Sequence, residues 1–362
     1  MTRLTRRTLL LGGSVLAAGA ARPRSSLARV KVAPNRAIRS IAGLRPFRPS
    51  GFVVRGEKLD SKTVVHNYGH GGAGITLSWG TSQLAVEEGA KSGARECAVI
   101  GCGVVGLSTA RLLQLRGYNP VIYAKAMPPE TTSNVAGGLW EPTSLYDRGR
   151  TPPEFNNQFT QAARFAFRRY QSLAGDLYGV RWVPLYRLSD HAYEPPAEDS
   201  PYHEIEKLYP ETQVLRQGEH PFHVPFAERR QTMLIEPAIY LNQLIRDFFV
   251  AGGKMVIREF AERREIAAMK EDLIFNCTGL GAGPLFGDQE LTPIRGQLVF
   301  LLPQPEVDYC TIGPGSVYMF PRHDGILLGG TFDRGVSATE PDPSITERIL
   351  RDNGELFGKM RG

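Results

Sequence analysis

Residues 97–125 have the sequence CAVIGCGVVGLSTARLLQLRGYNPVIYAK, and the fold can be inferred from this stretch. The apolar run Cys97–Ile100 predicts a buried strand, a helical pattern follows over about residues 107–116, and Asn119–Tyr123 predicts a second strand. Two strands joined by a helix form a βαβ unit, the building block of doubly wound sheets. We therefore expect an α/β fold with a Rossmann-like domain.

The connection between the first strand and the helix contains Gly101, Gly103 and Gly106 at G-x-G-x-x-G spacing. Between a strand and a helix, these glycines permit a tight turn, close approach of a pyrophosphate and packing of the helix on the strand. The positive end of the helix then faces the phosphates. Ordinary glycine-rich turns can have the same spacing, but this context favours a bound dinucleotide.

The residue that ends the second strand leaves the identity of the dinucleotide open. An acidic residue normally binds the ribose hydroxyls there, whereas this chain has Lys125. A cation at this position indicates either the phosphorylated ribose of NADP or a surface lysine in a protein that holds FAD by other contacts.

The chain has 362 residues, of which 42% are hydrophobic, enough for one large or two modest domains. Its formal net charge of +6 is local, because six arginines and no acidic residues lie within the first 29 residues. The remainder is nearly neutral, so we expect no nucleic-acid partner. The cysteines lack the spacing of metal ligands and are expected to be small buried residues, with no metal site: Cys97, Cys102, Cys277 and Cys310.

Residues 1–28 have the features of an export signal. Thr5–Leu10 contains a twin-arginine pattern, and the apolar run Leu9–Ala21 is too short for a stable membrane span. The twin-arginine route exports proteins that have already folded. We expect a periplasmic or secreted protein without a stable membrane anchor, and a disordered basic terminus is the alternative.

A second glycine-rich loop lies upstream of the βαβ unit. Four glycines between residues 69 and 74 separate a predicted strand end near Val65 from a helical pattern over about residues 75–88. Bare backbone before a helix suits close approach of a ligand ring or phosphate, and a simple tight turn is the alternative. Further upstream, Arg45 and Arg48 lie on an extended segment stiffened by prolines.

The rest of the chain predicts further helices and a second, more antiparallel sheet. Helices are expected at about residues 154–173, 235–249 and 345–356. Strands are expected as a pair around residues 178–188, in the first sheet at 254–260 and 273–275, and in the second sheet at 295–302, 316–320 and 325–331.

Several motifs together resemble the D-amino-acid oxidase family of FAD flavoenzymes. They are CAVIGCGVVGLSTARLL, TTSNVAGGLWEP, FNCTGLGAGP, RGQLVFL, SVYMFPRHDGILLGGTF, GLRPFRP and HNYGHGGAGITLSWG, which together cover most of the chain after the signal. The last of these motifs is the most specific. The resemblance implies an FAD cofactor, a doubly wound FAD-binding domain and an antiparallel-sheet domain that covers the flavin.

The order of these motifs differs from the order in the family. There, the GLRPFRP and HNYGHGG segments close the chain, whereas here residues 41–80 precede the βαβ unit. The sequence therefore predicts a circular permutation, in which a former C-terminal helix continues through residues 89–94 into the first strand. Surface termini that lie close together make permutation tolerable. A truncated or rearranged gene product is the alternative.

The resemblance implies roles for three residues at the reacting end of the site. Arg45 is expected to bind the substrate carboxylate as a fork, Tyr318 to donate its hydroxyl to that carboxylate, and the carbonyl of Gly72 to accept from the substrate amine. The implied reaction is hydride transfer from the α-carbon of a D-amino acid to the flavin, followed by hydrolysis to a 2-oxo acid and ammonia. Dioxygen would reoxidise the flavin and give hydrogen peroxide.

The resemblance also implies which residues bind FAD, from the pyrophosphate turn to the flavin ring. They are Gly101, Cys102, Gly103, Val104, Val105, Gly106, Thr131, Thr132, Ser133, Gly138, Leu139, Phe260, Thr278, Gly71, Gly74 and Thr76.

Three departures from the family pattern affect the site. Lys125 replaces the acid that holds the ribose, Pro314 replaces a second lid tyrosine, and Glu141 replaces a neutral amide in the substrate pocket. Phe320 is expected in the same pocket. A carboxylate at residue 141 either favours a cationic substrate side chain or points to solvent.

The expected organisation alternates two domains along the chain. The FAD-binding domain takes residues 40–150 and 226–290, the substrate domain takes 151–225 and 291–345, and a C-terminal helix covers 346–362. The expected protein is a periplasmic FAD-dependent D-amino-acid oxidase, and its oligomeric state is left open. The alternatives are a dehydrogenase that reduces a quinone or cytochrome, an exported flavin-binding protein without catalysis, and an NADP-dependent reductase.

Overall fold

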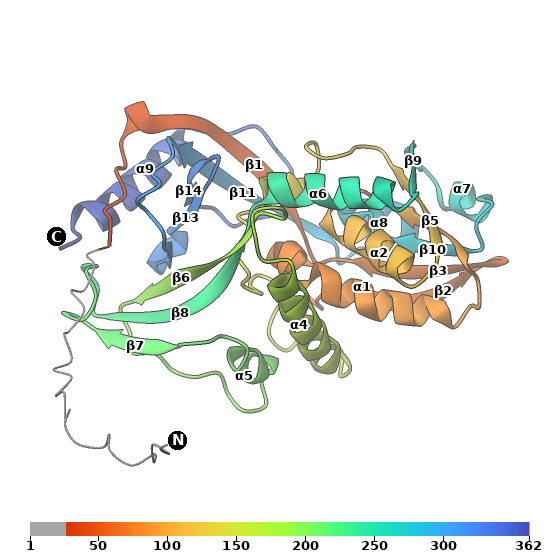
Figure 1. Cartoon of the computed structure of the whole chain (residues 1–362), viewed down its shortest axis with the longest axis horizontal. Helices are drawn as coiled ribbons and strands as arrows, with labels where there is room; N and C mark the ends of the chain where they lie inside the picture. The colour runs from red at the N-terminus through yellow and green to blue at the C-terminus, as the bar shows by residue number, and fades with distance from the viewer. Residues whose placement is uncertain (1–26, 362) are drawn as a thin grey trace, which may run out of the picture.

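The computed structural model describes residues 27–361, which form two β-sheets joined side by side (Figure 1). The twin-arginine pattern and the apolar run expected to follow it lie outside the described residues. Within the part of the chain that is described, no helix is long and apolar enough to cross a membrane.

The smaller sheet has six strands in the order β2-β3-β10-β4-β5-β9. The strands are β2 (Val53–Leu59), β3 (Lys62–Tyr68), β10 (Leu273–Asn276), β4 (Glu96–Ile100), β5 (Asn119–Ala124) and β9 (Lys254–Ile257). β2 pairs antiparallel with β3 at one edge, and every other neighbouring pair is parallel. β4 and β5 with the helix between them are the predicted βαβ unit, which confirms the α/β fold.

Helices cover both faces of this sheet, as parallel strands require. α1 (Gly74–Ala90), α2 (Val104–Leu115) and α6 (Pro237–Val250) share a hydrophobic core with one face, and α4 (Phe155–Ser172) packs against α1. α7 (Arg263–Ala267) and α8 (Ala282–Phe286) contribute to a second core with strand residues such as Val64 and Ile274.

The larger sheet has nine strands, and all but one of its pairings are antiparallel. Its order is β1-β11-β14-β13-β12-β6-β8-β7, with β15 also paired to β11, and β12 runs parallel to β6. The strands are β1 (Ala37–Phe47), β11 (Thr292–Leu301), β14 (Gly325–Gly329), β13 (Tyr318–Arg322), β12 (Cys310–Ile312), β6 (Val180–Ser189), β8 (Phe226–Ile235), β7 (Gln213–Arg216) and β15 (Asp333–Arg334).

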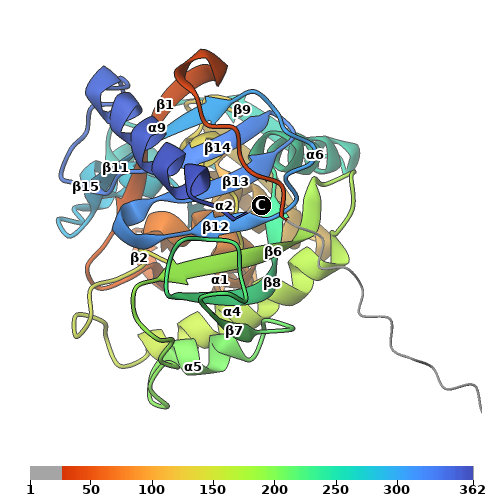
Figure 2. The same ribbon diagram turned by 90° about the vertical axis from the view of Figure 1, so that its left-hand side faces the viewer.

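Alternation along these strands gives the larger sheet two apolar faces. Leu298 and Phe320 lie on an inner face, together with Leu139 from the connection after β5. Val299 and Met319 lie on the outer face, which is covered by α9 (Pro343–Gly358) (Figure 2). The inner face is therefore free to form one wall of a site. Shorter helical segments complete the chain: α3 (Thr132–Val135), α5 (Pro201–Glu206) and the 3₁₀ turns Pro34–Arg36, Gly71–Ala73, Gly279–Gly281 and Pro314–Ser316.

Two segments expected in the FAD-binding domain pair in the larger sheet instead. β1 falls within the predicted range 40–150 and β8 within 226–290, yet β1 pairs with β11 and β8 pairs with β6. The strand pair expected around residues 178–188 is also a single strand, β6, whose partner is β8. A local apolar pattern indicates a strand, but its partner depends on backbone hydrogen bonds between distant segments.

The two ends of the described chain lie next to each other (Figure 1). The guanidinium of Arg29 donates to the carbonyl of Met360, and the hydroxyl of Tyr309 donates to the carbonyl of Ala28 at 2.8 Å. Val30 and Met360 both belong to the core on the outer face of the larger sheet. This core therefore holds both ends of the described chain.

Candidate active site

A cavity of about 880 Å³ lies between the two sheets. One wall is made by the segments that follow the carboxyl ends of the parallel strands, and the other by the inner face of the larger sheet. The segments after β3, β10, β4, β5 and β9 that line it are 69–72, 277–281, 101–103, 125–126 and 258–261. Open α/β sheets bind ligands in this crevice because helix N-termini and bare loop backbone meet there.

The turn expected to hold the pyrophosphate lies on this cavity. Gly101–Val105 line it, and the backbone N–H of Val104 in the first turn of α2 donates to the hydroxyl of Ser133 at 2.9 Å. Gly106 does not line the cavity but fixes how α2 meets the turn. A Cβ on Gly106 would come within 2.1 Å of the carbonyl oxygen of Gly101. The residues of this turn therefore fit a dinucleotide.

Nearly all of the other predicted FAD contacts also line the cavity. These are Thr131, Thr132, Ser133, Gly138, Leu139, Phe260, Thr278, Gly71 and Gly74. Thr76 is the exception, because it is buried and is not among the residues that line the cavity. Its hydroxyl contacts the carbonyl oxygen of Glu141 at 3.2 Å and the backbone nitrogen of Glu141 at 3.3 Å. Thr76 therefore helps to position the loop that contains Glu141.

Lys125 lines the cavity near the end of β5, where the ribose was expected. Its ammonium forms an ion pair with the carboxylate of Glu259 at 3.2 Å, and both side chains are mostly exposed. An exposed pair of this kind contributes little to stability. Lys125 is thus a partnered surface lysine at the rim of the site.

The cavity is also lined by the three residues expected to bind the substrate, Arg45, Tyr318 and Gly72. Arg45 lies on β1, and its Nη1 donates to the carbonyl of Thr331 at 3.2 Å. Tyr318 begins β13, and its ring lies stacked against Phe320 with the centroids 5.1 Å apart. Gly72 lies in the turn before α1, where its N–H donates to the carbonyl of Ser144 at 3.1 Å. Phe320 also lines the cavity, as expected.

Tyr318 and Arg45 are electrostatically coupled. Burial raises the pKa of Tyr318, and the neighbouring Arg45 guanidinium opposes this shift without cancelling it. The hydroxyl therefore stays protonated at neutral pH and acts as a hydrogen-bond donor. A guanidinium fork beside a phenolic donor is well suited to hold a carboxylate.

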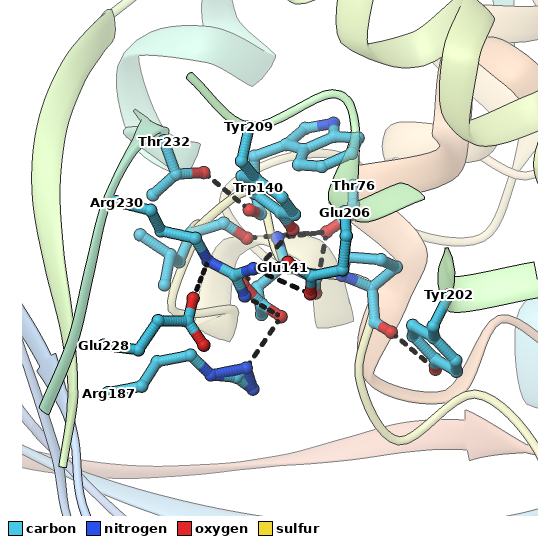
Figure 3. A network of polar contacts seen from close by, with 12 residues as sticks. Thr76, Trp140, Glu141, Arg187, Tyr202, Glu206, Tyr209, Glu228, Arg230 and Thr232 are labelled. Carbon is cyan, nitrogen blue, oxygen red and sulfur yellow. Dashed lines mark hydrogen bonds and ion pairs between the residues drawn. The ribbon is translucent and has the colours of Figure 1, made fainter. Parts of the chain in front are cut away.

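Glu141 lines the cavity, but it is neither exposed to solvent nor an unpaired charge (Figure 3). Its two carboxylate oxygens accept from Nη2 of Arg230 at 3.2 and 3.0 Å, and Oε1 also accepts from Nη1 of Arg187 at 3.3 Å. The hydroxyl of Tyr209 donates to Oε2 at 3.3 Å. The expectation that Glu141 points to solvent is therefore wrong, because it is the buried partner of two arginines that the sequence pattern does not associate with it. The expected preference for a cationic substrate side chain stays a prediction.

Arg230 is the centre of this network and is only 1% exposed. Besides Glu141, its Nη1 donates to both oxygens of Glu206 at 2.9 Å, and its Nε lies 3.3 Å from the carboxylate of Glu228. Burial alone would lower the pKa of Arg230, but the surrounding carboxylates outweigh it and raise the pKa. Burial also raises the pKa of Glu228. The arginine is thus a fixed cation that three carboxylates share behind the cavity wall.

Arg187 is a charged cavity residue that the sequence analysis did not point to. It lies 46 residues from Glu141 in the chain, on a strand expected to form a local pair. The one indication in the sequence is the two-residue period of a strand. Val183 and Leu185 face inward, so Arg187, two residues further on, is expected to point inward as well.

Comparisons with known proteins agree with this geometry. The family described as FAD dependent oxidoreductase matches residues 14–88 and 96–361. The D-amino-acid oxidase of Rubrobacter xylanophilus is 33% identical over 272 residues, which cover 73% of this chain and 78% of that protein. This chain belongs to the D-amino-acid oxidase family.

Other members and neighbours of this family are more distant. The D-aspartate oxidase of Homo sapiens is 29% identical over 258 residues, covering 70% of this chain and 73% of that protein. The L-alpha-glycerophosphate oxidase from Mycoplasma pneumoniae, solved with FAD bound, shares the fold with a TM-score of 0.54 at 14% identity, covering 74% of this chain and 79% of that chain. The D-amino-acid oxidase family uses FAD, which settles the choice between FAD and NADP that Lys125 left open.

The buried network gives a stability prediction. Arg230→Met should lower the free energy of unfolding by about 3–5 kcal/mol, because it leaves the carboxylates of Glu141 and Glu206 without their cation. Urea unfolding followed by tryptophan fluorescence measures this loss. Arg229→Met, on the same strand but the opposite face, is the matched control and should change stability by about 0.5 kcal/mol or less. Equal effects of the two substitutions would contradict a central role for Arg230.

Proposed function

We propose that this protein oxidises D-amino acids to 2-oxo acids and ammonia and passes the electrons to dioxygen, giving hydrogen peroxide. The observation that carries the proposal is that Arg45, Tyr318 and Gly72 line the same cavity as the glycine turn that fits a dinucleotide, with Arg45 next to Tyr318. The names of the curated relatives support D-amino acids as the substrate class.

FAD, when bound, accepts a hydride from the α-carbon of the substrate. The residues of the chain bind and orient. Arg45 and Tyr318 hold the α-carboxylate, and the carbonyl of Gly72 accepts a hydrogen bond from the neutral amine. Three contacts on two substituents of one carbon fix which of its bonds faces the flavin, so orientation supplies most of the catalysis. The product imino acid then hydrolyses in water, which needs no protein group.

The alternatives differ in their electron acceptor or in catalysis itself. A dehydrogenase would use the same substrate contacts and give its electrons to a quinone or cytochrome. A flavin-binding protein without catalysis would need neither Arg45 nor Tyr318, so their meeting in the cavity disfavours it.

The direct test is the visible spectrum of the purified holoprotein. Anaerobic addition of a mixture of D-amino acids should bleach the flavin, whereas the matching L-amino acids should not. Admission of air should restore the oxidised spectrum and release one peroxide per turnover. If a quinone restores the oxidised spectrum but air does not, the protein is a dehydrogenase and the oxidase proposal is wrong.

Substitution of Arg45 tests the substrate contact separately from the cofactor. Arg45→Ala should leave FAD bound and cost about 2–5 kcal/mol in kcat/KM, because a charge-assisted pair in a closed site is lost. Steady-state kinetics with the best substrate measures this. Arg39→Ala is the control, because Arg39 lies on the same strand but pairs with Asp324 at the surface. Unchanged kinetics in Arg45→Ala would remove this residue from the substrate site.

We also propose that the chain is a circular permutation of the family fold. Three observations support this. The family matches two separate stretches with a gap at residues 89–95. α1 ends at Ala90 and β4 begins at Glu96, so a short connection replaces the expected old terminus. The ends of the described chain lie side by side, as closure of the original order requires.

Restoring the family order tests the permutation. Residues 41–88 are moved behind Gly362 through a short Gly/Ser linker, and the chain starts near Arg95. Because contacts and not chain order place Arg45 and Gly72, the restored protein should bind FAD and turn over the same substrates. Its stability should shift by only a few kcal/mol, since loop-closure entropy changes slowly with loop length. A folded restored protein that binds no flavin would refute the permutation.

Export by the twin-arginine route is a further part of the proposal, based on Arg6 and Arg7 and the apolar run after them. Replacing both residues with lysine should retain the precursor in the cytoplasm, as fractionation and blotting would detect. Mature protein in the periplasm of this variant would show that a different signal is used.

A further inference from the structure

Arg187 lies in one row with Tyr318 across the inner face of the larger sheet. Arg187 on β6 is the register partner of Ile312 on β12, and Ile312 is the partner of Tyr318 on β13. All three residues line the cavity. Neighbouring strands lie about 4.8 Å apart, so the Cα atoms of Arg187 and Tyr318 are about 10 Å apart. Both side chains are long, and both line the same cavity.

The guanidinium of Arg187 keeps most of its donors available. Its side chain is 32% exposed, and its hydrogen bond within the described residues joins Nη1 to Oε1 of Glu141 at 3.3 Å. A guanidinium has five N–H groups, and a carboxylate can take two of them in parallel. The side of Arg187 that faces the cavity can therefore bind a second anion.

The carboxylate of Glu141 is already engaged by protein groups. Arg230 contacts both of its oxygens, Arg187 contacts one of them, and Tyr209 donates to the other. Arg230 also pairs with Glu206, which does not line the cavity. A cationic substrate side chain would therefore have to compete with two arginines for Glu141.

The remaining charged neighbour of Arg187 is Glu228, its register partner on β8. Glu228 is 6% exposed and does not line the cavity. Burial raises the pKa of its carboxyl, and the attraction of Arg230 and Arg187 only partly offsets this. Arg45, Arg187 and Glu141 line the cavity, whereas Glu206 and Glu228 do not, so two cations and one carboxylate face the cavity here.

We propose that Arg187 determines substrate specificity by binding the side-chain carboxylate of an acidic D-amino acid, D-aspartate or D-glutamate, while Arg45 holds the α-carboxylate. The inference rests on the proposed function and names the substrate class of that site. It reverses the preference for cationic side chains expected from Glu141 in the sequence. No covalent step is added, because Arg187 only binds and orients.

The test compares each acid with its uncharged amide, which has nearly the same shape. In the wild-type protein, kcat/KM for D-aspartate or D-glutamate should exceed that for D-asparagine or D-glutamine by about 30-fold or more. In Arg187→Gln this preference should disappear because kcat/KM for the acid falls. The values of kcat/KM for the amides and for D-alanine should change by less than a few-fold. Arg187→Lys should restore part of it. Arg216→Gln removes a positive charge from exposed β7 of the same sheet and should leave the preference intact.

A binding measurement separates this inference from the proposed function. Succinate should raise the melting temperature of the wild-type holoprotein more than butyrate does, and Arg187→Gln should abolish the difference. If no D-amino acid bleaches the flavin but this difference is found, the oxidase proposal fails and the second carboxylate site stands. If neutral D-amino acids are oxidised faster than acidic ones, or Arg187→Gln slows all substrates alike, the role of Arg187 is refuted.

Discussion

The antiparallel pairing of β1 with β11 is the interaction on which the geometry of the site depends. It runs in register from Phe47 opposite Thr292 to Arg39 opposite Phe300, with an irregularity only at the far end. This register places Arg45 opposite Ile294 with its guanidinium over Gly296. A slip of one residue would turn Arg45 to the opposite face of the sheet.

The same strand joins the two sheets. Six residues after Phe47 the chain begins β2 of the smaller sheet. At this passage Arg48, whose side chain is 15% exposed, forms ion pairs with Asp288 at 2.7 Å and Glu290 at 2.8 Å. Because these acids lie just before β11, the pairs tie the junction to the strand that β1 pairs with. These ion pairs therefore fix the edge of the cavity at which β1 leaves the larger sheet. Arg45, the residue proposed to bind the substrate carboxylate, lies at this edge.

The electrostatics of the cavity are set by residues that do not line it. Arg230 is buried behind the wall and pairs with Glu141, so a carboxylate that lines the cavity is partly offset by a cation that does not line it. Arg230 is in turn shared by three carboxylates, Glu141, Glu206 and Glu228. Arg187, which is half-buried, adds a second cation on the cavity side of Glu141.

The sequence by itself determined the βαβ unit and the glycine turn, and its resemblance to the family pointed to most of the predicted residues that line the cavity. The βαβ unit and the turn depend on local spacing, because a strand, a tight turn and a helix start within about ten residues of each other. The bounds of α1, α2, α4, α6 and α9 follow the predicted helices closely for the same reason.

The tertiary structure alone decided the placement of β1 and β8, the role of Thr76 and the partners of Glu141. Each of these depends on contacts between segments far apart in the chain, such as Glu141 with Arg187 and Arg230. No local pattern specifies such a contact, because the charge of a side chain is visible in the sequence but its neighbours are not. In the sequence Glu141 is an acid without a partner, whereas the folded chain surrounds it with two arginines, one of which also lines the cavity.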